Sequence, residues 1–290
     1  MENEIMSFTL IKGTFHVKGY SPDGDSIRFR AKDPTNWKKL SGPAVGLNAL
    51  GHAQLRIEAI DALETHFGGM HQPLRYARSA ARYLLSSLGI HEVVWDETQS
   101  FVVKAEDGTK GFILARSTEK NRRPVAFVFA GETEFADGEG VQLDARLLKQ
   151  SLNYKSVAKG LAYPTYYNGL FSDLREAFTQ AVISARAEDK GIWPSDRTTK
   201  GFSVADIKLL TEQIVIMPKL FRRIIEYMGN GGKIDEFMDH LLKGCEPLVK
   251  IPEVNFSRFD SIVEIKEDRL RLTVAPERLI FLDKVLCQQS

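Results

Sequence analysis

Residues 56–64 read RIEAIDALE, and this stretch decides the fold. Apolar side chains at positions 55, 57 and 59 alternate with charged side chains at positions 56 and 58, which is the period of a half-buried β-strand. Two acids, Asp61 and Glu64, follow where this strand should end. The stretch therefore predicts a strand over residues 55–60 whose end carries a pair of carboxylates.

Strand patterns surround this stretch in the first half of the chain. Residues 7–18 are rich in Phe, Thr, Ile and Val, a turn follows at residues 21–25, and residues 26–30 alternate as residues 55–60 do. Pro73 suits the first turn of a helix that runs to Leu88. We predict further strands at residues 93–95, 101–103, 112–115 and 125–129, a long loop at 33–51 and a long amphipathic helix at 170–189. The pattern indicates an α+β fold in which helices pack on a small barrel.

The last third of the chain has a different pattern. Residues 194–201 begin with a proline, continue with polar residues and end with a glycine, so they are interpreted as a linker. Helices are predicted at residues 204–217, 219–227 and 234–242, and a hairpin at 261–265 and 269–274. We therefore expect one domain over residues 1–197 and a mostly helical extension over residues 198–290, whose composition indicates no role.

Composition excludes several classes of protein. The chain has 290 residues, 39 Lys and Arg against 38 Asp and Glu, and a net charge of +1, so it is not a strongly basic nucleic-acid coat protein. No apolar run approaches the length of about 18 residues that a membrane span needs. The first residues lack the basic region of a secretory signal, and the only two cysteines, Cys245 and Cys287, cannot form a disulfide framework or a Cys-based zinc site. These features predict an intracellular, cytoplasmic protein with reduced thiols.

Three short segments combine acids with arginines. They are the turn that contains Asp25, the stretch from Arg56 through Asp61 to Glu64, and the loop that ends at Arg123 before a predicted strand. Carboxylates bind hard cations, and guanidinium groups clamp phosphate oxygens. Each segment alone also fits a structural role as a turn, a solvated strand face or an exposed loop. Their joint order and spacing favour a site that a cation and a phosphate share.

With these motifs in place, the chain resembles the staphylococcal-nuclease-like (thermonuclease) family over residues 7–196. Residues 23–26 match its D-G-D-[TS] turn, residues 56–64 match R-x-x-x-x-D-[TA]-x-E, residues 119–127 resemble D-K-Y-G-R-x-[LV]-A-[YF], and residues 191–193 resemble its closing helix end with I-W. The resemblance implies a five-stranded OB-type β-barrel packed by about three helices. A mostly helical C-terminal extension with a short hairpin would follow.

The resemblance also implies roles for single residues. Asp25, Asp61 and the backbone carbonyl of Ala62 would be metal ligands, and Ca²⁺ would be the metal, with Mg²⁺ or Mn²⁺ as alternatives. Glu64 would orient or deprotonate the attacking water. Arg56 and Arg123 would neutralise charge on the phosphate. The implied reaction is endonucleolytic hydrolysis of DNA, RNA or both by 5′ P–O cleavage, which leaves 3′-phosphate ends.

The chain departs from the family pattern around the substrate. Asn121 and Arg122 stand where the family has Tyr and Gly. Lys120, Tyr163 and Tyr166 are tentative substrate-binding residues, although the intervals around the tyrosines differ from the family's. A catalytically inactive nuclease-like module that binds nucleic acid or a protein partner is the alternative function. In either case no membrane partner is expected, and the C-terminal extension is a candidate for oligomerisation or for binding a protein partner.

Overall fold

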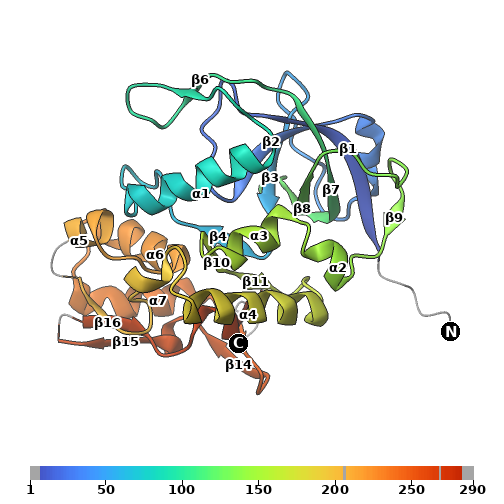
Figure 1. Ribbon diagram of the computed structural model, residues 1–290. Helices are drawn as coiled ribbons and strands as arrows, with labels where there is room; N and C mark the ends of the chain where they lie inside the picture. The colour runs from blue at the N-terminus through green and yellow to red at the C-terminus, as the bar shows by residue number, and fades with distance from the viewer. Residues whose placement is uncertain (1–6, 205–206, 268, 283–290) are drawn as a thin grey trace. The chain divides into compact units, whose positions relative to one another are not determined.

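The computed structural model describes residues 7–204, 207–267 and 269–282 (Figure 1). Two compact units make up the chain. One consists of Met1–Glu58 with Ala80–Ser156, and the other of Ala59–Ser79 with Val157–Ser290. The chain therefore passes between the units within the stretch RIEAIDALE and again within helices α1 (Leu74–Ser87) and α3 (Leu152–Ala158).

A closed five-stranded β-barrel forms the first unit (Figure 1). Its strands are β1 (Phe8–His16), β2 (Ser26–Ala31), β3 (Ala53–Ile57), β7 (Thr109–Thr118) and β8 (Pro124–Ala130). Their order is β2-β3-β8-β7-β1, and pairing of β1 with β2 closes the barrel. All pairs are antiparallel except β3 with β8, which is parallel. This topology confirms the predicted α+β class with a small barrel and is consistent with an OB-type barrel.

The barrel interior follows from the alternation in these strands. Successive side chains of a strand point to opposite faces, so every second residue can be buried. Phe15 on β1, Phe29 on β2 and Leu55 on β3 are fully buried, and Ile113 and Phe127 from β7 and β8 join them. The apolar positions of residues 55–57 are thus core positions.

Short elements complete the first unit. They are the 3-10 helix η1 (Pro34–Lys39), the paired strands β5 (Val94–Trp95) and β6 (Val102–Lys104), strand β9 (Gly140–Val141) and helix α2 (Ala145–Leu148). Asn153 at the start of α3 is fully buried: it accepts from the Val128 backbone N–H at 2.9 Å and donates to the Ala126 and Glu58 carbonyls. The Asn153 side chain therefore connects α3 to β8 and to Glu58, which follows β3.

The second unit mixes helices with small sheets. Strand β4 (Ile60–Ala62) pairs with β10 (Ala162–Pro164), and helix α4 (Ser172–Ala187) follows in sequence. A four-stranded sheet has the order β11-β17-β13-β14, and a three-stranded sheet has the order β12-β16-β15. Their strands are β11 (Tyr166–Tyr167), β12 (Phe202–Ser203), β13 (Pro247–Lys250), β14 (Asn255–Arg258), β15 (Val263–Lys266), β16 (Arg269–Leu272) and β17 (Leu279–Phe281); the helices are α5 (Ile207–Glu212), α6 (Pro218–Met228) and α7 (Phe237–Gly244).

The C-terminal third differs from the mostly helical extension that we expected. The β15–β16 hairpin and helices α6 and α7 agree with the prediction. The helix predicted over residues 204–217 is short, since α5 covers only Ile207–Glu212 and Val215 forms a β-bridge with Asp196. Among the described residues beyond position 201, six strands are present. Apart from the hairpin, they were not predicted, because runs of two to four residues are too short to distinguish from loops by their pattern.

The interpretation of residues 194–201 as a linker is wrong. Thr198 is fully buried, and its hydroxyl donates to Asp196 at 2.6 Å and accepts from the Met217 backbone N–H at 2.9 Å. The Leu272 N–H donates to the Thr198 carbonyl at 2.8 Å, so this segment pairs with the residues that were to form a separate domain. Polar residues here satisfy buried backbone groups instead of meeting solvent. The division between units accordingly does not fall at Arg197.

Two further expectations concern the chain as a whole. Cys245 is disulfide-bonded, which does not agree with the expected reduced thiols; Cys287 lies outside the described residues. Within the part of the chain that the structure describes, none of the helices combines the length and the apolar composition that a bilayer span needs.

Candidate functional site

The RIEAIDALE stretch forms two strands instead of one. β3 ends at Ile57, and Ala59 adopts the left-handed conformation with φ of 67° before β4 begins at Ile60. The Thr165 N–H donates to the Ala59 carbonyl at 3.0 Å and holds this turn. Asp61 therefore lies inside the short strand β4, opposite Tyr163 of β10, and not at the end of the strand that carries Arg56.

Asp61 and Glu64 bind the same cationic side chain, Arg222 of α6. Arg222 Nη2 donates to Asp61 Oδ2 at 2.8 Å, and Nη1 donates to Asp61 Oδ1 at 3.0 Å. The same Nη1 also donates to Glu64 Oε1 in a short hydrogen bond. Two carboxylates three residues apart therefore converge on one nitrogen atom. Nothing in the sequence pointed to Arg222, because it lies 161 residues from Asp61 on a helix whose other charged residues resemble a solvated face.

This charge cluster is largely withdrawn from water. The side chains of Asp61, Glu64 and Arg222 are 7%, 15% and 25% exposed. Burial lowers the pKa of Arg222, but the neighbouring Asp61 and Glu64 carboxylates outweigh burial and raise it well above its ordinary value. The guanidinium is therefore always charged, and it neutralises one of the two carboxylate charges.

Gln72 connects the loop of Glu64 to the chain just before α6. It is fully buried, its Oε1 accepts from the Glu64 N–H at 3.2 Å, and its Nε2 donates to the Ile216 carbonyl at 2.8 Å. A Cβ atom at Gly68 in the same loop would lie 3.3 Å from Ile225 of α6. The loop and the helix thus pack closely, which sets the position of Arg222.

The barrel brings a second set of predicted residues together. The Asp25 carbonyl accepts from the Ile57 N–H at 3.0 Å, and Ser26 pairs with Arg56 across β2 and β3. Arg56 in turn is opposite Val125 on the parallel neighbour β8. The Asp25 turn, Arg56 and the start of β8 therefore lie on three adjacent strands of the first unit.

Arg123, just before β8, has an acidic partner that the sequence analysis missed. Its Nε donates to Glu119 Oε1 at 3.1 Å, and its side chain is 32% exposed. Burial alone would raise the pKa of Glu119. The hydrogen bonds and charge of Arg123 outweigh burial, so the pKa of Glu119 lies below its usual range. The spacing of four residues across a loop is the only sequence signal for this pair.

Arg122 takes the position where the resembling family has glycine, and its φ of 64° lies in the left-handed region. Such a backbone costs a non-glycine residue about 1–2 kcal/mol. Two hydrogen bonds hold it: Arg122 Nε donates to the Ala44 carbonyl at 2.9 Å, and the Gly46 N–H donates to the Arg122 carbonyl at 2.8 Å. The loop before Arg123 is therefore fixed by the long insertion at residues 33–51.

The three tentative substrate-binding residues behave differently. Lys120 is exposed in the turn before Arg123. Tyr163 and Tyr166 are fully buried, and their hydroxyls bond Asp196 at 2.6 Å and Thr179 at 3.1 Å. Burial, followed by the charge and bond of Asp196, raises the pKa of Tyr163 well above its usual range. Both tyrosine side chains are fully buried, and their assignment to substrate stays a prediction.

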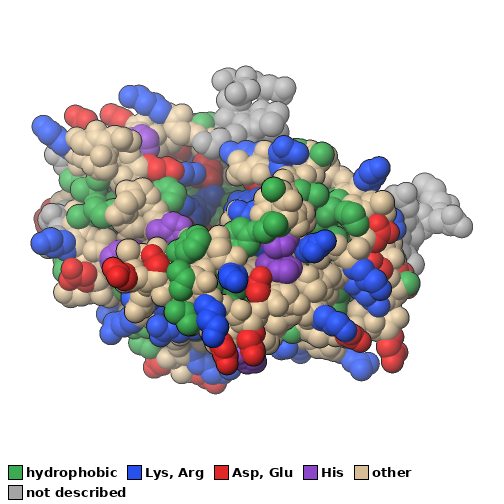
Figure 2. Space-filling model, turned by 90° about the horizontal axis from the view of Figure 1, so that it is seen from above, with side chains coloured by type: hydrophobic (Ala, Val, Ile, Leu, Met, Phe, Trp, Pro, Cys, Tyr) green, Lys and Arg blue, Asp and Glu red, His purple; other side chains and the backbone are tan. Residues whose placement is uncertain are grey.

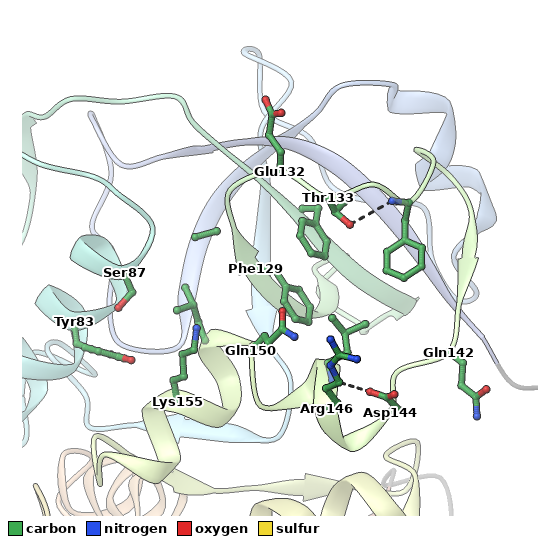
Figure 3. A pocket seen from close by; sticks show the side chains of 15 residues that line it. Tyr83, Ser87, Phe129, Glu132, Thr133, Gln142, Asp144, Arg146, Gln150 and Lys155 are labelled. Atoms are coloured by element: carbon green, nitrogen blue, oxygen red, sulfur yellow. Dashed lines mark hydrogen bonds between the residues drawn. The ribbon is translucent and has the colours of Figure 1, made fainter.

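The first unit also contains a pocket of about 720 Å³ (Figure 3). It is lined by Tyr83 and Ser87 of α1, Phe129 of β8 and Lys155 of α3, among others. No predicted site residue lines it. On the face shown in Figure 2, Lys and Arg side chains are interspersed with acidic ones, in keeping with the net charge of +1.

No protein-family model matches the chain, and no curated protein matches it at a significant level. Among the described residues, no three or more His, Cys, Asp or Glu side chains are grouped as a metal site would need. The residues that could carry chemistry are thus the acid pair with Arg222 and the Asp25, Arg56 and Arg123 set.

Proposed function

We propose that this chain is a metal-dependent phosphodiesterase of the thermonuclease-like type, an endonuclease that hydrolyses DNA, RNA or both. The observation that carries the proposal is the convergence of Asp61 and Glu64 on one cationic nitrogen. Carboxylates in apolar surroundings are costly unless a cation compensates them. In a pair arranged in this way, Asp61 is suited to bind a cation and Glu64 is suited to accept a proton.

The strand order supports the finer part of the proposal, an OB-type barrel that presents arginines. Arg56 and Arg123 belong to adjacent parallel strands or their immediate ends. Planar guanidinium groups donate in pairs to phosphate oxygens, and they stabilise charge that grows on the phosphate in the transition state. Exposed Lys120 would contact the nucleic-acid backbone as a point charge.

The donor chemistry of the acid pair fits a hard divalent cation. Oxygen atoms of carboxylates and backbone carbonyls are the ligands that Ca²⁺, Mg²⁺ and Mn²⁺ prefer. Asp61, the Ala62 carbonyl and Asp25 would hold the ion, and Ca²⁺ is proposed from the family resemblance. When bound, the ion would act as a Lewis acid toward a phosphate oxygen.

The chain's own residues would then divide the remaining work. Glu64 would accept a proton from the attacking water, a contribution of about 10²–10⁴-fold in typical enzymes. Arg56 and Arg123 would hold the phosphate while the 5′ P–O bond breaks, leaving a 3′-phosphate. Glu119 would orient Arg123 through the 3.1 Å hydrogen bond to its Nε, which leaves the terminal nitrogens of the guanidinium for the phosphate.

One observation favours the alternative, an inactive nuclease-like module that binds nucleic acid or a protein. Arg222 already compensates Asp61 and Glu64, so the acids have a stable partner without any metal. The two functions differ in one respect that can be measured. An inactive module binds an oligonucleotide or a protein partner but does not hydrolyse a nucleic acid.

Digestion of plasmid DNA, single-stranded DNA and RNA across Ca²⁺, Mg²⁺ and Mn²⁺ tests the proposal. We expect cleavage that EDTA abolishes, products with 3′-phosphate ends by mass spectrometry, and loss of cleavage in Asp61→Asn. Cleavage that persists in EDTA would contradict the metal dependence. Binding of a fluorescent oligonucleotide with no cleavage of any substrate would establish the inactive module instead.

A further inference from the structure

Arg222 uses its whole guanidinium fork on the two acids of the proposed metal site. Both oxygens of Asp61 accept from it, at 3.0 and 2.8 Å, and one oxygen of Glu64 accepts from the same Nη1. A divalent cation bound to the same carboxylate oxygens would lie within a few ångströms of the guanidinium, and the two positive charges repel at that distance. The guanidinium therefore opposes binding of a metal ion at Asp61.

The other cations of α6 bind acids other than Asp61 and Glu64. Lys219 and Arg223 both bind Glu246, at 2.6 and 3.1 Å, and Arg223 also binds Glu226 at 3.0 Å. Arg222 instead binds Asp61 and Glu64 of the RIEAIDALE stretch. The cations of α6 therefore form two separate groups of ion pairs, one with Glu226 and Glu246 and one with Asp61 and Glu64.

Hydrogen bonds of buried side chains fix the residues directly before α6. Gln72 ties the Glu64 loop to Ile216, two residues before α6, and the Met217 N–H donates to the buried Thr198 hydroxyl. The Arg222 side chain is itself 25% exposed, so it can leave the acids without unfolding the helix. If the side chain left the acids while the helix stayed in place, the site would change from a state closed by the guanidinium to an open one.

We propose that Arg222 is an internal competitor for the cation site of Asp61 and Glu64, and that it sets the divalent-metal concentration at which the site is loaded. This inference rests on the proposed function. A metal ion binds the open state only, so its apparent affinity is the intrinsic affinity multiplied by the fraction of molecules in that state. A phosphate group, which a guanidinium binds in the same two-pronged way as a carboxylate, would draw Arg222 off the acids and thus couple substrate binding to metal loading.

Calorimetric titration of Ca²⁺ into the full chain tests the competition. Arg222→Met removes the charge and keeps an unbranched apolar side chain, and Arg223→Met is the matched control. Arg223 is also 25% exposed and also binds two acids, but neither is Asp61 or Glu64. If the open state is a tenth of the population or less, Arg222→Met binds Ca²⁺ about tenfold more tightly or better, and Arg223→Met binds as the wild type does. Equal or weaker binding in Arg222→Met overturns the proposal.

Folding is checked by thermal melts with and without Ca²⁺. Arg222→Met leaves two buried carboxylates uncompensated, so its melting temperature should fall without Ca²⁺ and recover with Ca²⁺ by more than that of the wild type. If Arg222→Met is insoluble, Arg222→Lys is read in its place. Lysine binds one carboxylate as a point charge, so Ca²⁺ affinity above that of the wild type supports the competition and unchanged affinity overturns it.

The nuclease assay on the same proteins separates this inference from the proposed function. Tighter Ca²⁺ binding in Arg222→Met without cleavage by any protein supports the competition and rejects the nuclease. If the wild type cleaves and Arg222→Met binds Ca²⁺ with the same affinity as the wild type, the competition is rejected and the nuclease is supported.

Discussion

Asp196 is a single buried residue on which three donors depend. Its Oδ1 accepts from the Tyr163 hydroxyl, the Thr198 hydroxyl and the Thr198 N–H, at 2.6, 2.6 and 2.9 Å. A buried donor that loses its acceptor costs about 1–3 kcal/mol. We expect Asp196→Ala to lower the free energy of unfolding by about 3 kcal/mol or more, and Tyr163→Phe by only about 1 kcal/mol, since Phe removes one bond and strands nothing. Urea denaturation measures both, and equal losses would contradict this network.

A second residue-scale prediction concerns pH. The His52 ring stacks on His16 with centroids 4.0 Å apart, and its Nδ1 bonds the Tyr20 hydroxyl. Burial, followed by the charge of His16, lowers the pKa of His52 below its ordinary 6.5, although Asp107 opposes this. The unfolded chain therefore binds more protons than the folded chain, and the stability from neutral His52 is complete above about pH 6.5 and is lost as the pH falls.

The measurement is the free energy of unfolding of wild type and His52→Gln between pH 8 and pH 5. We expect the wild type to lose more stability than the variant below about pH 6.5. Parallel curves would show that His52 keeps its ordinary pKa in the folded chain.

At the scale of elements, closure of the barrel depends on a close approach between β1 and β2. A Cβ atom at Gly13 would lie 2.1 Å from the Arg30 carbonyl oxygen and 2.6 Å from the Phe29 ring. Gly13→Ala should therefore lower the free energy of unfolding by about 1–3 kcal/mol, the range for overpacked positions. Gly169→Ala is the control, because nothing lies within 4 Å of its Cβ position. A thermal melt that gives both variants the same small change would exclude strain at the β1–β2 contact.

How much the sequence predicts also differs between elements. The barrel strands were predictable because alternation marks one buried face, as in residues 26–30 and 55–57. The turn at Ala59 was not predictable, since a left-handed residue is usually Gly or Asn, and alanine continues a strand pattern. The role of Asp61 as a metal ligand stays a prediction, and its strand, its burial and its partner Arg222 depend on tertiary contacts that the sequence does not show.

At the scale of the whole molecule, residues beyond 197 complete structure that begins before them. β17 pairs in parallel with β11, which carries buried Tyr166, and Glu277 binds Arg186 of α4 through two hydrogen bonds of 2.6 and 2.9 Å. The segment 194–201 was predicted as a linker because proline and polar residues are frequent in linkers, and their burial cannot be inferred from composition. The C-terminal third is therefore part of a core.

A truncation follows from this integration. The fragment of residues 1–197 loses the partner strand of β11 and the acceptors and donors around Thr198, so its second unit should lack fixed packing. We expect far-ultraviolet circular dichroism to show the helices that precede residue 197, but with weaker near-ultraviolet signals and poorer amide protection of the second unit than in the full chain. A fragment with native-like protection of β4 and β10 would show that residues 198–290 are dispensable for folding.

Single-turnover cleavage of a fluorescent oligonucleotide by wild type, Arg56→Lys, Arg123→Lys and Glu64→Gln tests the central claim most directly. Lysine cannot replace a planar two-pronged donor, and glutamine cannot accept a proton, so each variant should cleave about 10²–10³-fold more slowly than wild type. Equilibrium binding of the oligonucleotide should change little, because these contacts strengthen only in the transition state. If the wild type cleaves and all three variants cleave within about threefold of it, with unchanged melting temperatures, the chemistry takes place elsewhere in the molecule.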